Sequence, residues 1–64
     1  MLIEALEKLT YHQLHGIAHD INNDLHDCNR FDLITAITNH VDEGVSRGLW
    51  TTEKWIKDVL VKDS

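Results

Sequence analysis

Three helix-start signatures divide the 64-residue chain. Thr10 is followed three residues later by Gln13, the spacing of a capping box, in which each side chain bonds the other residue's backbone N–H. Asn29 precedes Asp32 by the same spacing, and Thr51 is a third residue of the N-cap type. Apolar residues flank each start at the two positions of a hydrophobic staple. The pattern predicts that one helix begins after each of these three caps.

Apolar residues recur at helical spacing along the chain, and no proline interrupts them. We expect an all-α fold of four helices at residues 2–9, 11–22, 30–47 and 52–62, forming one compact domain over residues 1–64. The order is a short N-terminal helix, a helix-extended-helix unit and a C-terminal helix. The predicted inward-facing residues are Leu2, Leu6, Leu9, Tyr11, Leu14, Ile17, Ala18, Ile21, Phe31, Ile34, Ile37, Val41, Val45, Trp55, Ile56, Val59 and Leu60.

Two glycines inside this pattern carry separate expectations. Gly48 follows the third predicted helix and is expected to end it as the C′ residue. Gly16 lies within the second predicted helix, where glycine costs about 1 kcal/mol relative to alanine. It either allows a neighbouring backbone to approach closely or is simply tolerated, and tolerance is the more common case.

Composition narrows the classes of function. The chain has 11 acidic and 6 basic residues and a formal net charge of −5, which repels phosphate backbones unless the cations gather on one face. The single cysteine excludes an intramolecular disulfide and a thiolate metal cluster. No apolar run approaches the roughly 18 residues of a membrane span. We therefore expect a cytoplasmic protein without cofactor or enzymatic activity, whose default partner is another protein.

The segment from Ala18 to Asn23 resembles the phosphoacceptor box of sensor histidine kinases, with His19 as the acceptor. Such a box lies in the middle of a long helix whose apolar stripe continues on both sides. Here residues 22–29 are a polar, turn-forming run with a single large apolar residue, so the helix is expected to end there. The sequence predicts an exposed surface histidine at position 19 rather than a phosphotransfer site.

A capped helix with apolar residues at Leu14, Ile17 and Ile21 is followed by an extended linker and a second capped helix beginning Arg30-Phe31. This order, from Leu6 to His40, resembles the helix-extended-loop-helix modules of the SAP type and of the N-terminal domain of transcription terminator Rho. The resemblance covers a little over half of the chain. It implies a helical module that contacts nucleic acid through the linker and the start of its second helix.

The charges around that linker depart from the family pattern, which is rich in lysine and arginine. Arg30 is the only basic residue there, and Asp24, Asp27 and Asp32 surround it. Three carboxylates oppose a phosphate, even though a helix N-terminus can hold one through its backbone N–H groups. We therefore expect the fold of such a module without its DNA chemistry.

His12, His15 and His19 stand at i, i+3 and i+7, on one helical face. Two of them at i, i+4 could chelate zinc, nickel or copper, with Asp20 or the remaining histidine as a further ligand. A structural zinc site needs four ligands, so a solvated polar face is the favoured interpretation. A pH sensor is the related alternative, since protonating all five histidines would bring the formal charge of −5 to zero.

Trp50 and Trp55 are large side chains in a chain with little core to cover them. The favoured interpretation buries both inside the monomer, where the staple around Thr51 places them. In the alternative, one of them joins Leu49 and the apolar stripe of the last helix in a patch for self-association or a partner. Cys28 is expected to act as a small apolar side chain.

These observations predict a non-catalytic, acidic helical interaction module that binds another protein or itself, suited to a small regulatory or inhibitory protein such as phages encode. The predicted partner-binding residues are an acidic surface, comprising Asp20, Asp24, Asp27, Asp42 and Glu43, and an edge that contains Trp50 and Trp55. The first alternative is a nucleic-acid binder using Arg30, Lys54 and Lys57. The second is a metal or pH sensor using His12, His15 and His19.

Overall fold

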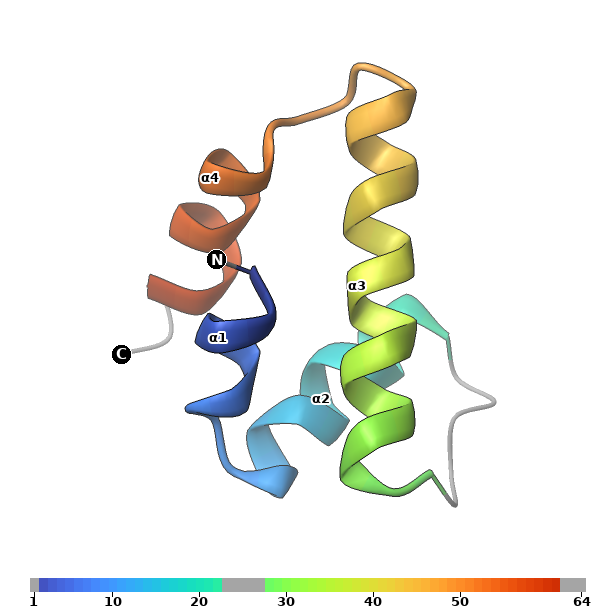
Figure 1. Ribbon diagram of the computed structural model, residues 1–64, viewed down its shortest axis with the longest axis vertical. Helices are drawn as coiled ribbons and strands as arrows, with labels where there is room; N and C mark the ends of the chain where they lie inside the picture. The colour runs from blue at the N-terminus through green and yellow to red at the C-terminus, as the bar shows by residue number, and fades with distance from the viewer. Residues whose placement is uncertain (1, 23–27, 62–64) are drawn as a thin grey trace.

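Helices begin at all three predicted caps in the computed structural model, which describes residues 2–22 and 28–61. The elements are α1 (Leu2–Glu7), α2 (Tyr11–Ile21), α3 (Arg30–Ser46) and α4 (Thr52–Trp55), and the last continues directly into the π-helix η1 (Ile56–Val61). Figure 1 shows α3 as the longest element, with α1 and α4 beside it and α2 crossing near its start. The described residues contain no strand, so the predicted all-α class is confirmed.

Each predicted N-cap makes its expected hydrogen bond. The Thr10 hydroxyl accepts from the Gln13 backbone N–H at 3.2 Å, while Gln13 Oε1 accepts from the Thr10 backbone N–H at 3.0 Å. Asn29 Oδ1 accepts from the Asp32 N–H at 2.8 Å, and Thr51 Oγ1 accepts from the Lys54 N–H at 3.2 Å. These bonds satisfy N–H groups that have no partner within the helix.

The C-terminus of α3 is closed by Gly48, as predicted. Gly48 has a φ of 76°, which favours glycine, and its N–H donates to the Val45 carbonyl at 3.0 Å. The Leu49 N–H donates to the Gly44 carbonyl at 2.9 Å, which completes a Schellman motif. The chain therefore turns sharply at this point and leads toward α4 (Figure 1).

The hydrophobic core lies where α1, α2 and α4 contact one side of α3. Leu33, Ile37 and Val41 are fully buried on that side of α3, and buried Gly44 extends the stripe. The complete core set is Leu2, Leu6, Leu14, Ala18, Leu33, Ile37, Val41 and Trp55.

Three residues predicted to face inward are instead exposed. Phe31 is 75% exposed, Tyr11 45% and Val45 40%. The buried stripe of α3 begins instead at Leu33, which is not among the residues predicted to face inward, because α1, α2 and α4 pack on that face of the helix. Tyr11 stays at the surface because its hydroxyl donates to the Cys28 carbonyl at 2.6 Å.

The C-terminal helix also differs from the single helix predicted over residues 52–62. Regular α-helix ends at Trp55, and the next six residues form a π-helix. Ile56 and Val59 in this segment are β-branched, a type that crowds the preceding turn of an ordinary α-helix. None of the described helices is long and apolar enough to cross a membrane.

Candidate functional site

An open groove of about 980 Å³ lies between α2, one histidine of α3 and the α4–η1 segment. We call it the histidine groove. Its apolar lining consists of Leu9, Ile17, Ile21, Trp55, Val59 and Leu60. Its polar lining consists of His12, Gln13, His15, His19, Asp20 and His40. Gly16 also lines the groove. The predicted histidine face of α2 thus forms one wall of a cavity that also has an apolar lining.

Imidazole rings form a row along α2. The ring centroid of His15 lies 6.0 Å from that of Tyr11 and 6.2 Å from that of His19, with interplanar angles of 29° and 22°. This row follows from i, i+4 spacing, which places successive rings one above the other on a helix. His12 and His19 are exposed, as a solvated polar face requires, and His15 is half-buried.

His40 joins these rings from α3, and the sequence prediction did not include it. Its ring centroid lies 5.5 Å from that of Trp50, at an interplanar angle of 42°. Position 40 directly precedes the buried Val41 and has no sequence motif in common with α2. Only the packing of α2 against α3 brings it into the groove.

The described part of the chain does not bring the predicted metal ligands together, and a metal site at His12, His15 and His19 stays a prediction. Within residues 2–22 and 28–61, no three His, Cys, Asp or Glu side chains gather closely enough to hold a metal ion. His12, His15 and His19 are all among these residues, and so is Asp20. Stacking along a helix spreads the rings, whereas a metal needs their nitrogens to converge on one point.

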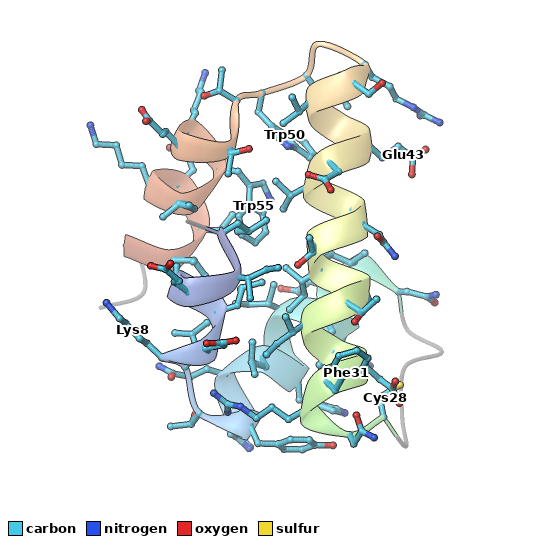
Figure 2. All side chains as sticks on the ribbon, viewed as in Figure 1. Lys8, Cys28, Phe31, Glu43, Trp50 and Trp55 are labelled. Atoms are coloured by element: carbon cyan, nitrogen blue, oxygen red, sulfur yellow. The ribbon has the colours of Figure 1, made fainter. Side chains whose placement is uncertain are left out.

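Both tryptophans pack within the chain. Figure 2 shows Trp50 and Trp55 in the space between α4 and α3. Trp55 is only 7% exposed and also lines the groove, so its partner-binding role stays a prediction. Trp50 is half-buried over Gly44, where a Cβ atom would overlap the indole ring, and its Nε1–H donates to the Val41 carbonyl at 3.1 Å. Burial within the chain is therefore the correct interpretation of Trp55 and, in part, of Trp50.

The predicted acidic residues occupy different places. Asp20 is exposed and lines the histidine groove, whereas Asp42 and Glu43 are exposed on α3. Glu43 pairs with Arg47 at 2.7 Å and lies on the side of α3 away from the tryptophans (Figure 2). Asp24 and Asp27 lie outside the described residues. The acidic surface as a whole stays a prediction.

The three cations assigned to nucleic acid do not form one patch. Arg30 is half-buried at the start of α3, and its guanidinium donates to the Glu7 carbonyl at the end of α1. Lys54 and Lys57 are exposed and line a second hollow of about 430 Å³ on the α4–η1 segment. Figure 1 shows α4 beside the end of α3 opposite to Arg30. The predicted cations are therefore too dispersed to act as a single phosphate-binding face.

Phe31 is the most exposed large apolar side chain among the described residues. It lies at the start of α3, on the same side of the molecule as Cys28 (Figure 2). Cys28 itself is half-buried and packs against the core, as its predicted role as an apolar residue requires.

The comparisons with known proteins add no functional assignment. No protein-family model, no curated protein and no solved structure matches the chain.

Proposed function

We propose that this chain is a non-catalytic interaction module that binds another protein, or a second copy of itself, through the histidine groove. One observation supports the proposal above the others: within the described part of the chain, the apolar lining of the groove stays partly exposed. Ile17, Ile21, Val59 and Leu60 are only half-buried there. Apolar side chains left open in a concave surface, with a few polar groups around them, are typical of binding sites.

The size of the groove suits a helical segment of the partner. An α-helix with its side chains is about 10–12 Å wide and rises 1.5 Å per residue, so it occupies roughly 120–170 Å³ per residue. A groove of about 980 Å³ is then equivalent to about two turns of helix. Helix-in-groove recognition uses this arrangement, in which the apolar face of an amphipathic helix lies against apolar residues.

The proposed module keeps two further parts of the sequence interpretation as proposals. Its likeness to SAP-type and Rho N-terminal modules is supported by the order of α2, linker and α3 and by the caps at Thr10 and Asn29. A regulatory or inhibitory role is kept as a proposal, for which the formal net charge of −5 is the one observation. Nucleic-acid binding is the weaker candidate, because Arg30 already bonds the end of α1.

A groove variant and a matched surface variant test the proposal. Leu60→Asp places a carboxylate in the groove, whereas Leu49→Asp makes the same change at a residue that is 62% exposed and outside the groove. The tag-free chain is immobilised and exposed to nuclease-treated lysate at two salt concentrations, and its self-association is measured by sedimentation over a range of concentrations. Circular dichroism checks that both variants remain helical.

The proposal predicts that Leu60→Asp abolishes capture of a protein or self-association, while Leu49→Asp retains it. Equal behaviour of the two variants would contradict a role for the groove. Recovery of material only without nuclease, with a strong dependence on salt, would favour the nucleic-acid alternative instead.

A further inference from the structure

Asp20 is the one carboxylate among the described residues that line the histidine groove. Resting on the proposed function, we infer that the occupant of the groove is a cationic amphipathic helix of another protein, with a lysine or arginine of that helix opposite Asp20. This assignment adds the chemistry of the partner to the site, and it needs no change in the charge of any histidine.

The carboxylate of Asp20 is open to a partner. Asp20 is exposed in the last turn of α2, and it forms no ion pair with another described residue, since the one ion pair in that part of the chain joins Glu43 and Arg47. No lysine or arginine is among the described residues that line the groove. The lining therefore offers a cation its opposite charge and offers an anion none.

The charge of the whole chain acts in the same direction. The formal net charge is −5, and the residues outside the described ranges contribute three aspartates against one lysine. Such a field attracts a cationic partner and speeds its encounter with the groove. A second copy of the chain carries the same −5 and is repelled, so a different protein suits the groove better than self-association.

Covering the groove makes a cation opposite Asp20 necessary. A helix laid on Ile17, Ile21 and Leu60 removes water from the neighbouring carboxylate, and a carboxylate loses stability without water unless it gains a donor. An acidic helix would add a like charge there, and a fully apolar one would supply no donor. Lysine and arginine are donors only, and their long aliphatic stems can lie on apolar side chains while the charged end reaches a carboxylate.

The first test selects the partner chemistry without assuming it. Displayed helical peptides of about 16 residues carry leucine along one face and Glu, Lys, Gln or Ser at random elsewhere. They are selected against the full chain at pH 8.0, above the ordinary titration range of histidine. We expect Lys-rich polar faces to be enriched over Glu-rich ones, and fluorescence anisotropy should show weaker binding of the best peptides at high salt.

A charge reversal assigns the effect to Asp20. Asp20→Lys should weaken binding of the best cationic peptide about three- to tenfold, because an attraction is replaced by a repulsion at an exposed site. Asp42→Lys makes the same change in net charge at an exposed residue of α3 outside the groove, and about 0.15 M salt should hold its effect below about twofold. A lysine in the last turn of α2 also suits the helix dipole, so the Asp20 variant should remain folded.

A neutral pair of variants tests the apolar part of the same contact. Leu60→Asn removes an apolar side chain from the groove without altering the charge, and it should reduce peptide binding at least tenfold. Leu49→Asn, at a side chain outside the groove that is 62% exposed, should leave binding unchanged. Circular dichroism checks that every variant is as helical as the parent chain.

The outcomes separate the inference from the proposed function. Enrichment of neutral or acidic faces, or equal effects of Asp20→Lys and Asp42→Lys, overturns the cationic partner while Leu60→Asn still marks the groove as the docking site. Selected peptides that bind the Leu60→Asn variant as tightly as the parent overturn both. Failure to select any peptide overturns the inference, and the capture experiment on Leu60→Asp then decides the proposed function by itself.

Discussion

The corner between α3 and α4 and the groove between α2 and η1 use apolar residues in opposite ways. At the corner, Trp50 covers Gly44, its Nε1–H bonds the Val41 carbonyl, and Gly48 closes the end of α3. In the groove, the aliphatic side chains of Ile17, Ile21, Val59 and Leu60 are half-buried beside a row of imidazoles. Among the described residues, the corner is a packed contact with a hydrogen bond, and the groove is an open hollow.

The difference shows what a large aromatic ring needs in order to pack closely on a helix. A large ring can lie directly on a helix only where the helix has no side chain, and its polar atom needs a partner there. The corner meets both conditions through Gly44 and the Val41 carbonyl. The groove also contains a glycine, Gly16, but nothing lies within 4 Å of the Cβ position at this residue. This comparison is why we place partner binding at the groove.

Removing the indole ring of Trp50 from the corner should reduce the stability of the fold more than any other change considered. Trp50→Ala deletes a half-buried indole and its bond to the Val41 carbonyl, and we expect a loss of about 2–4 kcal/mol in the free energy of unfolding. The neighbouring Leu49→Ala, at a side chain that is 62% exposed, should change it by less than about 0.5 kcal/mol. Urea denaturation followed by circular dichroism measures both. Similar losses in the two variants would remove the special role of the corner.

Adding a methyl group at Gly44, beneath the Trp50 ring, should cause the next largest loss of stability. In Gly44→Ala the new Cβ would overlap the Trp50 ring, and overpacking of this kind costs about 1–3 kcal/mol. The cost should depend on the ring. In a Trp50→Ala background, the same substitution should stabilise the chain by up to about 1 kcal/mol through helix propensity. A double-mutant cycle measures this reversal, and additive effects would contradict the contact.

The same substitution at Gly16, in the groove, should raise the stability of the fold instead of lowering it. Gly16→Ala gains helix propensity, and its Cβ meets no atom within 4 Å, so we expect about 0.5–1 kcal/mol of added stability. Thermal unfolding should show a rise of a few degrees, since 1 kcal/mol shifts the midpoint by about 4–8 °C in a domain of this size. Loss of stability would mean that the groove is closed around Gly16 in solution.

Local features of the fold were predictable, and the groove was not. Each cap at Thr10, Asn29 and Thr51 bonds a residue only three positions away, and Gly48 closes α3 through its own last turn. Such features are decided by short-range geometry. The segment η1, where an α-helix was predicted and a π-helix is found, contributes Val59 and Leu60 to the groove.

The buried face of α3 depended on its neighbours. Helical spacing alone allowed a stripe beginning at Phe31, but α1, α2 and α4 pack on the face of Leu33 instead. His40 could not be assigned to the site for the same reason. It lies 21 positions after His19, and only the contact between α2 and α3 brings both into one groove.

Added metal should change the stability of the chain least. His15 and His19 stack with their centroids 6.2 Å apart, and no third ligand converges on them among the described residues. We expect the unfolding midpoint to change by less than about 2 °C on addition of zinc or a chelator, because a ligand stabilises a fold only as far as it binds the folded state more tightly than the unfolded one. Differential scanning fluorimetry of the chain and of His15→Ala measures this. A chelator-sensitive rise of several degrees that His15→Ala abolishes would mean that the rings rearrange around a metal, and the groove would then be a metal-binding site rather than a protein-binding one.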